Sequence, residues 1–234
     1  IYDIIFSLYM TKLDQFTIIQ LIAICAKCKH LEIIKPVVLH ADEGSLYTIQ
    51  QRWNASLQEH LHSSPRISVQ SLYRGAHWAT ATDILLNTPD LQLWVISAGL
   101  GFLHHDDQVI PYEATFNSLP FSSSAWWQAL NAMEGLSRRC RDISTLMHRH
   151  PTDKFLIAGS PVYLRAIEAD LLQGLTALQC PESQLTIITS QAYSGPLTRF
   201  VTYSHAGMLN KLGANMVTLN IRLARQVIQT LTHA

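Results

Sequence analysis

Four titratable side chains stand in a row at His104, His105, Asp106 and Asp107. They follow an apolar run, residues 91–98, and a short segment that contains two glycines. Such a run is typical of a strand covered on both faces, and glycines after it allow a sharp turn or close approach to a ligand. Because ligands of open α/β sheets bind where strands end, we predict a site here. A plain turn with solvated side chains explains the same residues.

The acidic pair has chemistry suited to cleaving a bond at a sugar. Asp106 or Asp107 can position or deprotonate a water, or stabilise the positive charge that develops as a glycosidic bond breaks. His104 or His105 can hydrogen-bond to the departing group. These four residues are therefore the predicted catalytic set, with helix capping or solvation as the alternative role of the aspartates.

Aromatic, small and basic residues near other predicted strand ends are candidates for substrate contacts. Rings can stack on a planar base, and a Ser-Pro helix start offers free N–H groups to an anion. A polar loop after residue 189 could press on a phosphate backbone and insert a side chain into the base stack. The predicted substrate-binding residues are Gly99, Leu100, Gly101, Phe102, Tyr112, Ser160 and Tyr163, and the predicted DNA contacts are Arg74, Trp78, Ser190, Gln191, Tyr193, Ser194 and Leu197. Ordinary packing or loop structure is the alternative for each.

Composition limits the class of protein. With 234 residues and 48% apolar content, the chain can form one α/β domain over 1–234, with 1–15 as a loosely attached extension. Its 17 basic and 17 acidic residues cancel, although 1–120 carries 7 against 11 (net −4) and 121–234 carries 10 against 6 (net +4). The apolar runs are shorter than the roughly 20 residues of a membrane helix, so we expect no membrane partner.

The four cysteines indicate a reducing, cytoplasmic setting. Cys25 and Cys28 form a C-x-x-C that, with Cys140 and Cys180, could hold a metal or cluster. The second pair lacks the tight spacing of a zinc knuckle. We therefore expect buried or incidental thiols and no cofactor.

Apolar runs alternate with helical patterns along the chain. The predicted strands cover 16–24, 67–73, 91–98, 155–158 and 185–189. The predicted helices cover 45–60, 77–86, 122–150 and 162–175, and one or two helices cover 208–231 across Gly213. This alternation predicts a three-layer α/β/α fold with a central, mostly parallel sheet. Three strand exits, 99–112, 159–163 and 190–196, should then lie along one edge and converge.

Several common enzyme signatures are absent from the sequence. It contains no phosphate-binding loop with its lysine, no G-x-G-x-x-G and no G-x-S-x-G. Nucleotide hydrolysis, dinucleotide redox chemistry and α/β-hydrolase chemistry therefore lose support.

A set of short motifs resembles a family of bacterial and phage proteins described as peroxide-stress-like. The motifs are C-x-x-C-K at 25–29, LYRG-x-HW at 72–78, ISAG-x-G at 96–101 and IPY-x-x-TF at 110–116. They cover roughly residues 18–120. Their order along the chain, more than any one of them, carries the resemblance.

The order of strand exits over 91–200 also resembles the uracil-DNA glycosylase superfamily and the related domain of archaeosine synthases. That resemblance implies a catalytic acid at Asp106 or Asp107 and a DNA-entering loop over 190–197. The chain lacks that superfamily's Asp-Pro-Tyr and His-Pro-Ser motifs. It is also similar in kind to phage-defence DNA glycosylases that remove glucosylated hydroxymethylcytosine.

We therefore expect a DNA glycosylase that flips a modified base out of phage DNA and hydrolyses its N-glycosidic bond, leaving an abasic site. The glucosylated hydroxymethylcytosine of the last resemblance is the candidate base. Two alternatives stay open. One is an N-glycosidase or transferase acting on free nucleotides or nucleosides, and the other is a non-catalytic DNA-binding stress or defence module.

Overall fold

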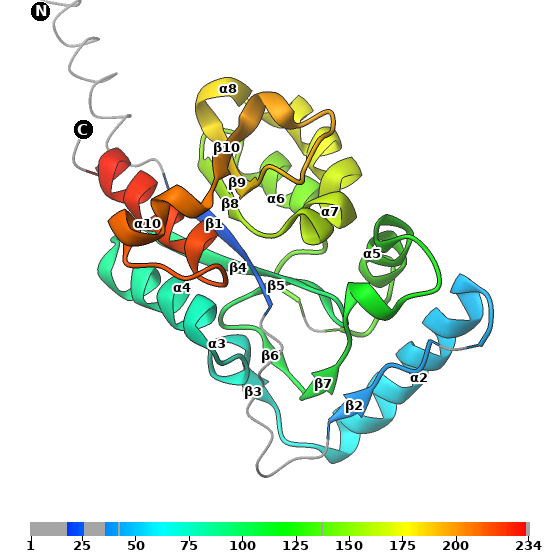
Figure 1. Cartoon of the computed structure of the whole chain (residues 1–234). Helices are drawn as coiled ribbons and strands as arrows, with labels where there is room; N and C mark the ends of the chain where they lie inside the picture. Colours follow the sequence, from blue (N-terminus) through cyan, green and yellow to red (C-terminus); the bar gives the residue numbers. More distant parts are fainter. Residues whose placement is uncertain (1–17, 26–35, 42, 137, 233–234) are drawn as a thin grey trace, which may run out of the picture.

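The computed structural model describes residues 18–25, 36–41, 43–136 and 138–232. Its centre is a six-stranded sheet in the order β10-β9-β8-β1-β4-β5 (Figure 1). The first five strands of this order are parallel, and β5 runs antiparallel to β4. The strands are β1 (Ile19–Ile24), β4 (Leu91–Ser97), β5 (Gly101–His104), β8 (Lys154–Ala158), β9 (Leu185–Ser190) and β10 (Val201–Ser204).

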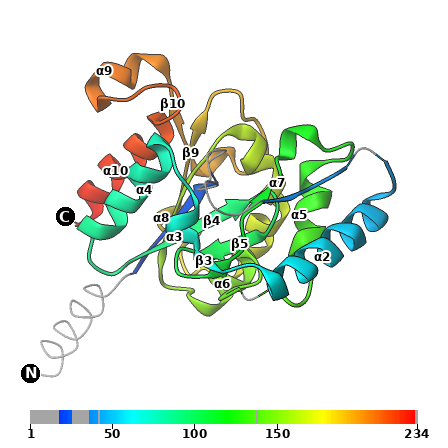
Figure 2. The same cartoon turned by 90° about the horizontal axis from the view of Figure 1, so that it is seen from below.

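Helices cover both faces of this sheet, as the three-layer prediction requires (Figure 2). On one face α4 (Ala76–Asn87) packs against α10 (Leu219–Thr232). On the other, α7 (Pro161–Gly174) packs against α5 (Ser123–Asn131) and α6 (Ile143–Arg149). Every residue of β1 except the last is buried, which explains its nearly continuous apolar sequence.

A smaller region lies beside the sheet. Its helix α2 (Leu46–Ser63) is capped by Ser45, whose side chain accepts a hydrogen bond from the amide of Thr48.

The remaining elements of the described chain are short. They are the paired strands β2 (Val37–Val38) and β7 (Tyr112–Glu113), the paired strands β3 (Ile67–Ser68) and β6 (Gln108–Val109), the helices α3 (Val69–Leu72), α8 (Pro181–Gln184) and α9 (Leu209–Leu212), and 3₁₀ turns at Phe116–Ser118, Leu175–Ala177, Thr198–Phe200 and Ala206–Met208.

Two predicted elements differ from the structure. The helix predicted over 122–150 is two helices, because the chain leaves helical geometry after α5 and starts again where Asp142 caps α6. The strand predicted over 67–73 is one short strand followed by α3, capped by Ser68. The predicted N-terminal extension, 1–15, lies outside the described residues.

The segment after β4 is the largest correction to the sequence analysis. It turns back at Ala98–Leu100, with Gly101 in the positive-φ region at 77°, and forms β5 against β4. The register pairs His104 with Trp94, and the amide of His105 donates to the carbonyl of Leu93. The His-His-Asp-Asp row therefore lies toward the amino edge of the sheet rather than the carboxyl edge.

The strand order reverses beside β1. From β1 the chain reaches β4 on one side of it, and later β8 on the other side. In open α/β sheets this is the switch point, where a crevice forms outside the carboxyl ends of the strands. Among the described residues, no helix has both the length and the apolar character needed to cross a membrane.

Candidate functional site

A thiol and a phenol meet across the switch point. Cys25 directly follows β1, and its sulfur lies 3.2 Å from the hydroxyl of Tyr163, in the first turn of α7. Burial raises the pKa of Tyr163, and the nearby sulfur raises it further. The phenol therefore keeps its proton, and either group can be the donor in this contact. Phe116 packs edge-on against the Tyr163 ring, with centroids 5.1 Å apart.

Three hydroxyls form a hydrogen-bonded chain at the carboxyl end of β4. The oxygen of Ser97 accepts the amides of Gly99 and Leu100 at 3.2 and 2.9 Å. Both lone pairs are then used, so Ser97 donates its hydrogen to Tyr112, 2.5 Å away. Tyr112 in turn lies 2.5 Å from the hydroxyl of Tyr73, so the chain of hydrogens runs from Ser97 toward Tyr73.

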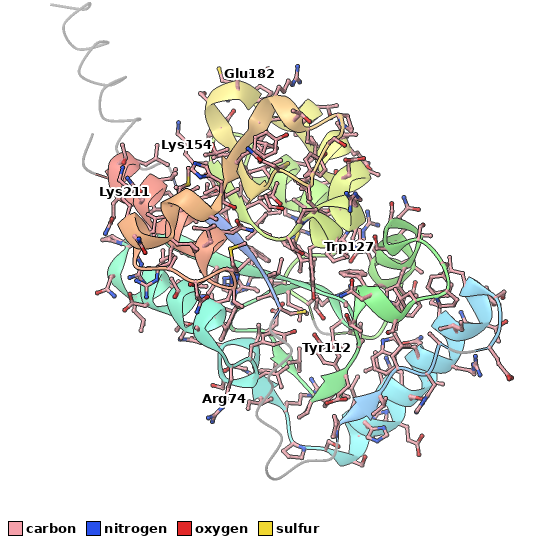
Figure 3. All side chains as sticks on the ribbon, viewed as in Figure 1. Arg74, Tyr112, Trp127, Lys154, Glu182 and Lys211 are labelled. Carbon is pink, nitrogen blue, oxygen red and sulfur yellow. The ribbon has the colours of Figure 1, made fainter. Side chains whose placement is uncertain are left out.

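Burial raises the pKa of both tyrosines in this chain, so both stay neutral. All three side chains are buried, so this chain of hydroxyls supports the carboxyl end of β4 from within the core. Figure 3 shows Tyr112 and Arg74 toward one end of the molecule and Lys154 and Glu182 toward the other. Tyr112 is adjacent to the end of β4 and Lys154 begins β8, so these ends correspond to the carboxyl and amino edges.

Three long helices begin at the same carboxyl edge. The side chain of Asn220, in α10, donates to the carbonyl of Gly159 at 2.8 Å, which joins the start of α10 to the exit of β8. His77, in the first turn of α4, contacts the carbonyl of Val217 at 3.3 Å, which joins α4 to the same region. Neither Gly75 nor Ser160, the caps of α4 and α7, makes a side-chain capping bond. Free helix N–H groups and aligned dipoles favour an anion here.

His77 adds a polar atom that the described residues do not satisfy. Its side chain is buried, and Nε2 has no hydrogen-bond partner among them. Burial lowers its pKa, so the ring is neutral at pH 7. A buried polar atom without a partner is uncommon and is consistent with a ligand at this edge.

The predicted catalytic residues are not part of this edge. Asp107 is buried, and its carboxylate accepts the amide of His104 at 2.8 Å and the amide of Arg139 at 3.2 and 3.3 Å. These bonds give Asp107 a role in holding the turn after β5. Asp106 is exposed and lies near Arg139, His104 and His105.

The predicted substrate-binding residues divide into two groups. Gly99, Tyr112, Ser160 and Tyr163 lie at the carboxyl edge, with Tyr163 and Ser160 half-buried and so the most open. Leu100, Gly101 and Phe102 belong to the β4–β5 hairpin and are buried. Phe102 stacks on Trp94 with centroids 4.9 Å apart, so it cannot stack on a base without repacking the core.

The loop predicted to enter DNA is folded onto its own domain. Tyr193 is buried and donates to the carboxylate of Glu168 at 2.5 Å, and Leu197 is fully buried. Trp78 is also buried and donates from Nε1 to the carbonyl of Gln70. These three residues are therefore structural. The predicted DNA contacts that remain at least partly exposed are Arg74, Ser190, Gln191 and Ser194.

Sequence reasoning missed Cys25 and Tyr73 as site residues, together with a polar groove between α5 and α7. The groove has a volume of about 230 Å³ and contains Asp170. Its carboxylate accepts the amides of Ile143 and Ser144 and the indole N–H of Trp127. Burial raises the pKa of Asp170 to about 6. An aspartate inside a helix pattern gives no sign of this in the sequence.

Two of the four cysteines predicted as possible ligands of a shared metal lie at opposite edges of the sheet. Cys25 follows β1 at the carboxyl edge, whereas Cys180 precedes β9 and so lies toward the amino edge. Cys25, Cys140 and Cys180 are free thiols, and Cys28 lies outside the described residues.

Comparison with known proteins gives no significant match to this chain among family models, curated proteins or solved structures.

Proposed function

We propose that the protein binds a nucleobase at the carboxyl edge of β1, β4 and β8 and cleaves its N-glycosidic bond. The Cys25–Tyr163 contact across the switch point is the observation that carries this proposal. It marks the position where ligands of such sheets bind, and it includes the partly exposed Tyr163 hydroxyl, which can donate or accept. The three helix starts beside it suit the phosphate of the same substrate.

The chemistry assigned to this edge is stabilisation of the departing base. In the hydrolysis, water forms the new bond to C1′ of the sugar, and the base leaves with the electron pair of the broken bond and takes up the proton that the water releases. Positioned O–H donors stabilise the negative charge on the departing base. Tyr163 is half-buried and keeps its proton, so we assign this role to it. Asp106 and Asp107 have no part in the step because they lie toward the other edge of the sheet.

DNA carrying a modified base is the substrate we propose, with glucosylated hydroxymethylcytosine as the candidate base and a cytoplasmic antiviral role. A base in DNA must leave the stack to reach a buried site. Arg74 is exposed beside the start of α4 and can pair with a phosphate. Ser190, Gln191 and Ser194 are the remaining candidates for backbone contacts.

A free nucleotide or nucleoside is the second candidate substrate. The burial of Tyr193 and Leu197 favours this free substrate over DNA. Both side chains are packed into the domain, so neither can insert into a base stack and hold an opened duplex. The same site and the same bond would be used. The two candidate substrates therefore differ only in whether the base belongs to DNA or to a free nucleotide or nucleoside.

The test is base release. The protein is incubated with unmodified, uracil-containing, hydroxymethylated and glucosylated DNA and with the matching nucleotides and nucleosides, and released bases are detected by mass. We expect release from at least one substrate, and loss of release in Tyr163→Phe. Asp106→Asn and a matched surface variant, Tyr47→Phe, should keep it. No release from any substrate, or loss in Asp106→Asn with activity kept in Tyr163→Phe, would overturn the proposal.

A further inference from the structure

Three of the four predicted catalytic residues, His104, His105 and Asp106, form a separate cluster toward the amino edge of the sheet. The potential ligand atoms of His104, His105 and Asp106 all lie within 4.8 Å of one another. Nδ1 of His105 is 3.1 Å from one carboxylate oxygen of Asp106, and Nδ1 of His104 is 3.9 Å from the other. We propose that these three side chains bind a divalent transition-metal ion, with Zn²⁺ as the best-matched ion. This site is independent of the proposed base-binding edge.

Two atoms that face each other at His105 suit a cation between them. Nδ1 of His105 is buried and makes no hydrogen bond, although a carboxylate oxygen lies 3.1 Å away. A neutral imidazole nitrogen and a carboxylate oxygen are both metal ligands. An ion between them would satisfy both.

The contacts of His104 orient its ring so that Nδ1 faces the proposed ion. In the tautomer that leaves Nδ1 free for an ion, Nε2 donates to the amide oxygen of Gln92, 3.0 Å away. Nδ1 is then the unprotonated nitrogen, and it accepts only a long, 3.3 Å contact from the amide of Asp106. Metal-binding histidines are typically oriented by such a partner on the second ring nitrogen.

The backbone holds the ligands on a rigid element. His104 ends β5, and the buried Asp107 carboxylate accepts its amide while the amide of Asp107 donates back to its carbonyl at 3.0 Å. Two nitrogens and one carboxylate leave a position for water, and the exposed Asp106 opens the site to solvent. Nitrogen ligands disfavour Mg²⁺ and Ca²⁺, which bind oxygen.

Arg139 competes for this site. Its guanidinium lies 3.6 Å from Asp106 and 3.2 Å from Nε2 of His104. An arginine N–H can only donate, so this second contact is a hydrogen bond when Nε2 is unprotonated and is lost when Nε2 carries the proton. The Arg139 side chain is half exposed and can swing into solvent when an ion enters.

The experiment titrates the full chain with Zn²⁺ by calorimetry and with Co²⁺ by visible absorption. We expect one ion per chain, with a Co²⁺ spectrum that has ligand-field bands but no thiolate charge-transfer band. Asp106→Asn and His105→Ala should each weaken binding by at least about tenfold, and Gln92→Ala by about 10- to 100-fold. Arg139→Ala should strengthen it.

His150→Ala is the matched control, because His150 lies 3.4 Å from Asp153 in another histidine–aspartate pair. It should bind the ion as the wild type does. No saturable uptake by the wild type, a thiolate band, or equal binding in Asp106→Asn and His105→Ala would overturn the proposal. Asp106 is exposed, so its variant should fold and keep the result interpretable.

Discussion

The hydroxyl of Tyr163 lies 3.2 Å from the sulfur of Cys25, although 138 positions separate the two residues in the chain. The contact forms because the strands before them, β8 and β1, are neighbours in the sheet and end at the same edge. It joins the two sides of the switch point.

Replacing Tyr163 with Phe removes one O–H and leaves the ring that packs on Phe116. The proposed base release should fall by about 100-fold, because a donor aimed at developing charge is lost. Stability should fall by only about 1 kcal/mol, the usual value of one hydrogen bond. Release kinetics and urea unfolding measure the two effects. A variant that loses stability and keeps its activity would assign Tyr163 to packing alone.

Gly99 should not tolerate a side chain. A Cβ there would lie 2.4 Å from two ring carbons of Tyr112 and 3.1 Å from Cβ of Ala114. We expect Gly99→Ala to cost about 1 to 3 kcal/mol of unfolding free energy by overpacking, and to displace the Tyr112 hydroxyl. Chemical denaturation checks the cost. Gly207→Ala is the control, because its nearest neighbour is the side chain of the exposed His205, at 3.1 Å.

The two adjacent aspartates should respond differently to alanine. Asp107→Ala leaves the amides of His104 and Arg139 without their acceptor, and we expect a loss of about 2 to 4 kcal/mol. Asp106→Ala changes an exposed side chain and should stay within about 0.5 kcal/mol in metal-free buffer. Thermal and urea unfolding of both variants test this difference. Equal losses would contradict the structural role of Asp107.

Much of the fold could be predicted from local sequence. The buried strands of the parallel sheet are short apolar runs between turn residues, and Ser160-Pro161 marks the start of α7 as expected. The antiparallel strand β5 was missed because it has only four residues, Gly101–His104. So short a run shows no periodic pattern of apolar residues that distinguishes an edge strand from a loop. That one pairing moved the predicted catalytic residues to the other edge of the sheet.

Part of the candidate site could also be predicted, because it lies where strands end. Tyr112, Ser160 and Tyr163 follow or lie near predicted strand ends, so the general rule for α/β sheets found them. The contact of Cys25 with Tyr163 and the chain from Ser97 to Tyr73 depend on the order of the strands, which no local pattern contains. The burial of Tyr193 likewise depends on Glu168, in a different element.

Asp170 should give the protein a pH-dependent stability. Burial raises its pKa from 3.8 to about 6 in the folded state. The native state then binds this proton more tightly than the unfolded state, so the contribution of Asp170 is greatest below pH 4 and is lost as pH rises toward 6. The unfolding free energy of the wild type minus that of Asp170→Asn should therefore fall by about 2 kcal/mol between pH 4 and 7. A difference that is constant with pH would contradict the raised pKa.

The position of the base-binding site can be measured by NMR. A nucleoside monophosphate is titrated into the labelled protein, and backbone amide shifts are followed. We expect saturable shifts at Gly99, Gly159 and Tyr163, with His104 to Asp107 unchanged. Shifts centred on His104 to Asp107, or no saturable shift at the carboxyl edge with either a nucleotide or a short modified DNA strand, would contradict it.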